Sequence, residues 1–200
     1  MHSATFRDAN VGALRQDWPR IPCPITVGAL RASAALGREV AALLDTETPV
    51  IGVSTGTTRP KLKMIASPAR IDGRPLTTVD FALTVGWGHA GKGGTTMPGK
   101  GRVEDRPATA EEGFSGTTHD VYLNARACWR HVPPDVWNYT LGGYPVLKKW
   151  LSYREQKVLG RALEFGEVKA FTSIARRIAA LLQMQEVLDA NYSRITLALD

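Results

Sequence analysis

The sequence predicts an α+β domain with an N-terminal helix, a small and mostly antiparallel sheet carrying a glycine-rich loop, and a helical C-terminal layer. Three observations support this prediction: a helical apolar repeat near the N-terminus, short β-rich runs separated by turn residues, and amphipathic stretches in the last third. With 200 residues, of which 44% are hydrophobic and 22% charged, the chain can bury one ordinary core. The same composition argues against intrinsic disorder.

Residues 1–25 are expected to form an extended strap. The segment 15–24 contains three prolines, and each proline removes a backbone donor and restricts the residue before it. Thr26 can then cap a helix that reaches about Asp45. The apolar residues of this helix recur three or four positions apart and are predicted to face the core: Ala29, Ala32, Leu36, Val40 and Leu43.

The middle of the chain is expected to form the sheet. Five β-rich runs are predicted as strands: PVIGVST (49–55), KLKMIAS (61–67), VDFALTV (79–85), HDVYLN (119–124) and ACWRHV (127–132). Between them, residues 86–102 contain seven glycines and four basic side chains. We expect this segment to be a polar, mobile loop, because glycine makes the unbound ensemble of a chain large.

Residues 141–193 are predicted to form a helical subregion, within a domain that spans 26–193 and is followed by a tail, 194–200. Pro145 suits the first turn of a helix. In that helix one face is apolar, with Val146, Leu147, Trp150 and Leu151, and the other carries Lys148 and Lys149. A last helix is expected over about Glu167–Leu188, with a buried stripe of Val168, Phe171, Ala175, Ile178 and Leu182.

The net charge of +6 is concentrated in two blocks. Residues 50–106 hold nine Lys or Arg against four Asp or Glu, and residues 141–180 hold eight against three. Basic surfaces attract polyanions, so the two blocks could line one groove for nucleic acid.

The sequence gives no sign of a membrane or a disulfide framework. No apolar run is long enough to span a membrane and the N-terminus is polar, so we expect a cytoplasmic protein with no membrane partner. Cys23 and Cys128 lie far apart and lack metal-ligand spacing. Both are expected to be ordinary buried or half-buried thiols.

Two motifs suggest enzymatic chemistry, and each has a simpler interpretation. Gly86, Gly91 and Lys92 approach a phosphate-binding loop, but Gly93 stands where a hydroxyl should bind magnesium. The segment could instead be a flexible loop whose lysines approach a DNA backbone.

The second motif resembles a nuclease pattern. Asp135, Glu167 and Lys169 match the carboxylate and lysine positions of such a site, yet a glutamate in the first turn of a helix is favoured by the dipole alone. The histidines show no ligand spacing, and no methyltransferase catalytic motif is present. We therefore expect no catalytic residue, metal or cofactor.

Aromatic and basic residues alternate between Trp129 and Arg154. Trp137 and Trp150 are expected to lie mostly in the core, because burial of large rings dominates core energetics. Tyr144 follows Gly142 and Gly143 and is expected to point outward.

Several long segments resemble one family. VYLNARACWRHVPPDVWNYTLGGYPVLKKWLSYREQKVLGRAL and FTSIARRIAALLQMQEVLDANY are similar to the C-terminal specificity domain of type ISP restriction-modification enzymes. DWPRIPCP, SAALGREVAALLDTETPV and GWGHAGKGGTTMPGKGR resemble the upstream part of that region, so the resemblance spans about 13–193. It implies a target-recognition domain of a polypeptide that also carries a nuclease, a translocase and an adenine-N6 methyltransferase.

The sequence therefore predicts sequence-specific recognition of double-stranded DNA, beside a methyltransferase or translocase polypeptide. The expected contacts to DNA are Lys92, Lys100, Arg102, Arg130, Tyr144, Lys148, Lys149 and Arg154. Two alternatives stay open. One is a module that only docks on such a protein partner, and the other is a small phosphodiesterase built on Asp135, Glu167 and Lys169.

Overall fold

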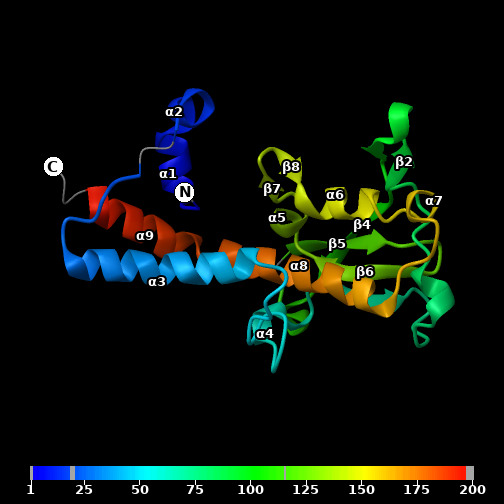
Figure 1. Cartoon of the computed structure of the whole chain (residues 1–200). Helices are drawn as coiled ribbons and strands as arrows, with labels where there is room; N and C mark the ends of the chain where they lie inside the picture. Colours follow the sequence, from blue (N-terminus) through cyan, green and yellow to red (C-terminus); the bar gives the residue numbers. More distant parts are fainter. Residues whose placement is uncertain (1, 19–20, 115, 197–200) are drawn as a thin grey trace. The chain divides into compact units, whose positions relative to one another are not determined.

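A computed structural model describes residues 2–18, 21–114 and 116–196 (Figure 1). The chain divides into two compact units. Unit 1 combines the residues up to Val50 with those from Ala180 onward, and unit 2 consists of Ile51–Ala179. The predicted α+β class is confirmed, because unit 2 combines an antiparallel sheet with helices and the described part of unit 1 is helical.

Unit 1 contains α1 (Ala4–Ala9), α2 (Val11–Gln16), α3 (Val27–Leu44) and α9 (Gln185–Thr196). Much of the expected N-terminal strap is therefore helical, because Ser3 caps α1 by accepting a hydrogen bond from the Phe6 amide. Thr26 caps α3 as predicted, with its hydroxyl 3.1 Å from the Ala29 amide. In the predicted stripe of α3, Val40 and Leu43 are buried and the other three residues are half-buried.

Helix α9 joins the two ends of the chain within unit 1. The Ser3 hydroxyl donates to the Asp189 carboxylate over 2.5 Å, and the Phe6 ring meets the edge of Tyr192 with centroids 5.5 Å apart. On α3, the Ser33 hydroxyl lies 3.1 Å from the Asn191 amide nitrogen, which donates to it. These contacts pack α1 and α3 against the same helix.

The sheet of unit 2 has four antiparallel strands in the order β1-β6-β5-β4. The strands are β1 (Ser67–Arg70), β4 (Val103–Ala108), β5 (Gly116–Tyr122) and β6 (Ala127–Val132). The two runs predicted as strands at 119–124 and 127–132 are confirmed as β5 and β6. Their register shifts between His119 and Val121, which marks a bulge.

The three earlier β-rich runs are not the strands that were expected. Residues 49–55 contain only an isolated bridge between Ile51 and Thr55. The run 61–67 begins in α4 (Pro60–Lys63), because proline favours the first helical position, and only Ser67 belongs to β1. The run 79–85 begins in the 3-10 helix η1 (Thr78–Phe81), which the Asp80 carboxylate caps by accepting from the Thr77 amide over 2.9 Å.

The glycine-rich segment is a β-hairpin and not an irregular loop. It consists of β2 (Gly88–Ala90), the short turn η2 (Lys92–Gly94) and β3 (Thr96–Pro98). A Cβ atom added at Gly99 would lie 2.0 Å from the Gly86 carbonyl oxygen, and one at Gly101 would lie 2.1 Å from the Trp87 ring. These glycines permit close packing, which a count of glycines cannot distinguish from flexibility.

The remaining elements of unit 2 follow β6 or precede β5. They are η3 (Ala110–Glu112), α5 (Pro134–Trp137), β7 (Thr140–Leu141), β8 (Tyr144–Pro145), α6 (Val146–Ser152), α7 (Gln156–Leu159) and α8 (Phe165–Gln183), of which the residues from Ala180 belong to unit 1. The single helix expected over 167–188 is wrong, since α8 ends at Gln183 and α9 begins at Gln185.

The core of unit 2 lies where β6, α6 and α8 meet. The Phe171 ring stacks on Trp129 at 4.1 Å between centroids and meets the edge of Trp150 at 5.6 Å. Trp87 and Trp129 are the fully buried tryptophans, whereas Trp137 and Trp150 are half-buried at its edge. Large rings therefore dominate this core, as expected of aromatic residues.

Cys128 is buried, as expected, whereas Cys23 is exposed, which contradicts the expectation of a buried or half-buried thiol there. Within the described ranges, no helix has the length and apolar character needed to cross a membrane.

Candidate nucleic-acid interface

Helix α6 lies between two β-hairpins on one side of unit 2, β7–β8 at one end and β2–β3 at the other (Figure 1). Leu147 and Leu151 are fully buried beneath the helix, so α6 is fixed to the core. Lys148 and Lys149 are only half-buried. We call α6, the two hairpins and α7 the α6 surface.

The β7–β8 hairpin presents Tyr144 to solvent. Leu141 pairs with Tyr144 across a two-residue turn of Gly142 and Gly143, with φ angles of 56° and 82°. Two consecutive positive φ angles favour glycine and suit the twist of a tight hairpin. The Tyr144 side chain is 65% exposed, so the expectation that it points outward is confirmed.

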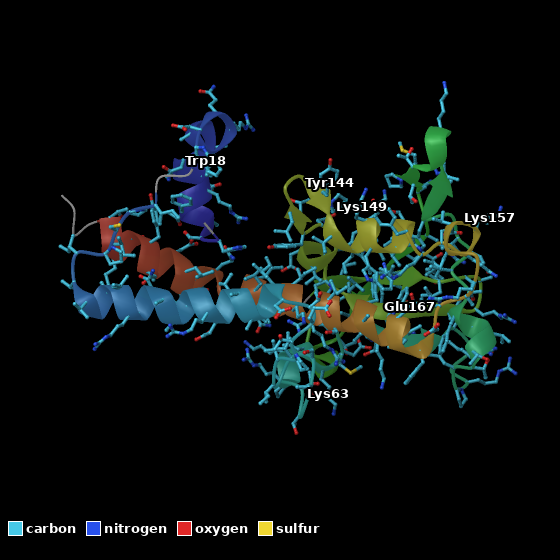
Figure 2. All side chains as sticks on the ribbon, viewed as in Figure 1. Trp18, Lys63, Tyr144, Lys149, Lys157 and Glu167 are labelled. Atoms are coloured by element: carbon cyan, nitrogen blue, oxygen red, sulfur yellow. The ribbon has the colours of Figure 1, made fainter. Side chains whose placement is uncertain are left out.

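Tyr144 and Lys149 belong to one cluster (Figure 2). The Lys149 ammonium lies 5.5 Å from the centroid of the Tyr144 ring and 4.8 Å from that of Tyr153. Two aromatic rings attract the ammonium through their quadrupoles and limit where it can lie. The cluster thus offers a positioned cation beside an exposed ring, which is a suitable contact for a phosphate and its sugar or base.

The β2–β3 hairpin is held to the core at its base. The buried Glu155 carboxylate accepts hydrogen bonds from the amides of Gly86, at 3.2 Å, and Trp87, at 2.8 Å. The Trp87 indole donates to the Tyr122 carbonyl oxygen over 2.8 Å. Lys92 at the tip and Lys100 after β3 are exposed. Because this segment is a hairpin, it lacks the strand-to-helix geometry of a phosphate-binding loop.

Arg102, just before β4, and Arg130, on β6, already have partners. The Arg102 guanidinium lies 3.9 Å from the centroid of the Tyr122 ring and pairs with Glu104 at 2.7 Å. Burial, together with the hydrogen bond to Glu104, raises the pKa of Tyr122 to about 12. Arg130 donates to the Arg70 carbonyl oxygen over 3.0 Å. For either arginine to contact DNA, it would have to exchange one of these contacts.

Arg154 also packs inward. Its guanidinium lies 4.0 Å from the centroid of a Trp150 ring and 3.7 Å from the Glu167 carboxylate. Burial lowers the pKa of Arg154, since removal from water disfavours the charged form. The structure therefore groups Tyr144, Lys148 and Lys149 on α6 and its hairpin, whereas Arg154 packs on Trp150 and faces Glu167.

Sequence reasoning missed two residues of this surface. His89 on β2 and Lys157 on α7 are exposed, and both line a cavity of about 540 Å³ at the base of the β2–β3 hairpin. No sequence periodicity could have linked these two residues, because they lie 68 residues apart. The hydrogen bond from the Trp87 amide to Glu155, across the same separation, holds their two segments together.

Glu167 and Lys169, two of the three nuclease-like residues, are engaged by neighbouring groups. The Glu167 carboxylate accepts from Arg161 over 2.6 Å and from the Glu164 amide over 2.9 Å, at the start of α8. The Arg161 hydrogen bond is the largest cause that lowers the pKa of Glu167. Lys169 lies over the Phe165 ring at 4.3 Å. Among the residues with described positions, no group of three or more His, Cys, Asp or Glu could hold a metal ion.

Comparison with known proteins identifies the family. A family model described as the type ISP C-terminal specificity domain matches residues 1–171 of the 200. The match begins before the region of resemblance found in the sequence and ends within α8, and it includes the whole α6 surface. Searches of curated proteins and of solved structures gave no match. Because the family model covers well over half of its length, this chain belongs to the family of type ISP C-terminal specificity domains.

Proposed function

We propose that this domain recognises double-stranded DNA for a restriction-modification adenine methyltransferase, and that the α6 surface makes the contact. The family description supports DNA target recognition. The observation that carries the assignment to this surface is the position of Lys149, next to the exposed Tyr144 ring and between two hairpins. The major groove of B-DNA admits an α-helix or a two-stranded β-ribbon, and the α6 surface offers both.

Lys92, Lys100, Lys148 and Lys149 would contact phosphates, and Tyr144 would contact a sugar or base. Lysines of this kind supply affinity without sequence information, whereas specificity requires contacts to base edges. Arg130 and Arg154 remain candidates for base contacts and Arg102 for a phosphate contact, but each would first have to give up part of its internal interactions. Substitution of the lysines is therefore the first test of the proposal.

The domain would position an adenine for methylation by a methyltransferase, either in the same polypeptide or in a separate one. Catalysis would belong to that partner, so this domain would need no cofactor of its own. Enzymes that modify bases usually extrude the target nucleotide, and a specificity domain would help hold the distorted duplex.

The experiment measures duplex affinity against salt concentration, from about 50 mM upward. Each phosphate contact releases counterions, so log affinity should fall with log salt at a slope of about −0.9 per contact. Replacing both lysines, Lys148→Ala and Lys149→Ala, should flatten the slope by about two units. Arg38→Ala, on the exposed face of α3 in unit 1, removes a charge outside this surface and should leave the slope unchanged.

Two results would contradict the proposal: a slope near zero in the unchanged protein, or unchanged DNA affinity in the double lysine variant. The docking module would then be the better explanation. Unit 1 favours that second candidate through its exposed apolar side chains. Trp18, which Figure 2 labels, is 86% exposed, Ile25 is 63% exposed and Val27 is 64% exposed.

A further inference from the structure

Unit 2 has a second recessed site, outside the α6 surface. A cavity of about 680 Å³ lies between α8, β1 and η1 and includes Pro68, Phe81 and Thr172 in its walls. It shares no lining residue with the α6 surface. Lys63, whose carbonyl oxygen accepts a hydrogen bond from one of the cavity residues, lies on the opposite side of unit 2 from Tyr144 and Lys149 (Figure 2).

The charge in this cavity is positive. Lys169 and Arg176 both line it, seven residues apart on α8 and therefore on one face of that helix. The other polar groups of its described lining are hydroxyls, and none of that lining is acidic. The nearest carboxylate along η1, that of Asp80, is fully buried and pairs with Arg70 at 3.2 Å.

Arg176 has unused hydrogen-bonding capacity in this position. One terminal nitrogen donates to the Lys63 carbonyl oxygen over 2.7 Å, while the Nε atom is buried and has no partner. Burial also lowers the pKa of Arg176, so the charged form is penalised by the site as it stands. An anion in the cavity would offset that penalty by pairing with the terminal N–H groups of Arg176, since guanidinium groups bind oxyanions through several N–H donors.

The other wall of the cavity is apolar. Leu76, Phe81, Phe165 and Val168 contribute to it, and the Phe81 and Phe165 rings are stacked with centroids 6.3 Å apart. The volume lies within the range of small-molecule pockets, about 300–1,000 Å³, and is larger than an inorganic ion needs. The ligand should therefore combine an anionic head with an apolar or planar group.

We propose that this cavity binds a phosphate ester, with Lys169 and Arg176 holding the phosphate and the apolar wall holding the attached organic group. A free nucleotide and a nucleotide of a DNA strand offer the same chemistry. The proposal does not depend on DNA binding by the α6 surface, because a free phosphate ester can test it alone.

The experiment follows the backbone amide signals of Thr172 and Ser173 by NMR in the full chain. Inorganic phosphate, AMP and a short DNA duplex are added separately, with chloride keeping the ionic strength constant. AMP or the duplex should shift both signals in a saturable way. Lys169→Ala should weaken that binding about tenfold, which is the scale of one charge-assisted hydrogen bond. Arg38→Ala removes an exposed basic side chain of unit 1, outside both the cavity and the α6 surface, and should not weaken AMP binding.

Comparison of the three probes identifies the source of the phosphate. Shifts with AMP or inorganic phosphate but not with duplex assign the cavity to a free ligand, and shifts with duplex that Lys169→Ala abolishes assign it to DNA. Because Arg176 is half-buried, Arg176→Lys provides a second variant that keeps the charge but loses the fork of donors. The proposal is overturned if none of the three probes shifts the signals, or if both variants bind as the unchanged protein does.

Discussion

Gly88 lies so close to Ser152 that a Cβ atom added at Gly88 would be 2.0 Å from the Ser152 carbonyl oxygen. This approach joins the β2–β3 hairpin to the end of α6 and sets the hairpin's position beside the helix. Gly88→Ala should therefore destabilise unit 2 by about 1–3 kcal/mol, because a backbone atom cannot move aside as a side chain can. Chemical denaturation measures this change.

Gly166→Ala is the matched control. Gly166 lies on α8, and nothing lies within 4 Å of an added Cβ atom. Alanine there should stabilise the helix by up to about 1 kcal/mol. Equal stability of the Gly88 and Gly166 variants would mean that the hairpin is not packed on α6.

Hydrogen exchange should separate the base of the β2–β3 hairpin from its tip. The Gly99 amide donates to the Trp87 carbonyl oxygen over 2.6 Å, and the Gly101 amide to that of Gly86 over 3.1 Å. Both amides should exchange slowly in the free protein, whereas the exposed Gly93 should exchange fast. Uniformly fast exchange across 86–101 would restore the interpretation as a mobile loop. If a DNA duplex slows amide exchange at the tip, the tip contacts the DNA.

Tyr144→Ala should weaken duplex binding by about two- to fivefold, which corresponds to the loss of one exposed cation–π contact to Lys149. Tyr144→Phe keeps the ring and should retain most of the affinity. Leu141→Ala alters the residue that pairs with Tyr144 across the turn and serves as a control. If the Ala and Phe variants bind equally, the ring does not position the lysine.

Glu167→Gln should reduce stability at neutral pH by up to about 1 kcal/mol and have no effect in acid. The hydrogen bond from Arg161 lowers the pKa of Glu167 in the folded state below its ordinary value. Its stabilising effect is therefore present above the unfolded-state pKa of about 4.3 and is lost as the pH falls through the folded-state pKa. Thermal unfolding as a function of pH measures the difference.

Glu164→Gln is the control for this prediction. The Glu164 side chain is 73% exposed and lies 3.7 Å from Arg161, so its replacement should have little effect at any pH. If the Glu167→Gln variant is as stable as the unchanged protein at neutral pH, the ion pair does not stabilise α8.

Incubation with Mg²⁺ and DNA should produce no cleavage. The Glu167 carboxylate accepts a hydrogen bond from the Glu164 amide at the start of α8, and Lys169 lies over the Phe165 ring. Agarose electrophoresis of supercoiled plasmid provides a sensitive measurement. Nicking that disappears in Glu167→Ala would support the phosphodiesterase alternative instead.

The strand predictions were correct only for the two runs that are joined by a short connection and pair with each other in the sheet. Residues 119–124 and 127–132 combine β propensity with a short connection, and they form the central pair β5 and β6. By contrast, the hydrophobic run 79–85 has the pattern of a strand but begins as a 3-10 helix. The side chains of Thr77 and Asp80 together cap that helix. Local hydrogen bonds of this kind override β propensity.

The candidate site was predictable in part. Lys148, Lys149 and Tyr144 lie within six residues of one another, so helical spacing and a glycine turn were enough to indicate them. The cavity that contains Arg176 was not predictable, because its walls come from segments as distant as Ser54 and Arg176. Only the fold brings such residues together.

The discontinuity of unit 1 sets an order for folding on the ribosome. Unit 2 is continuous in sequence, so it can fold as soon as its last residues emerge, whereas α3 is synthesised early and packs against α9, which comes near the end. At about 5–20 residues per second, α3 waits on the order of ten seconds for its partner. During that interval Val40 and Leu43, which are buried in the finished protein, stay accessible to chaperones. A message cut short before α9 would therefore yield a folded unit 2 that carries an unprotected apolar helix, which is the kind of product that cellular proteases remove.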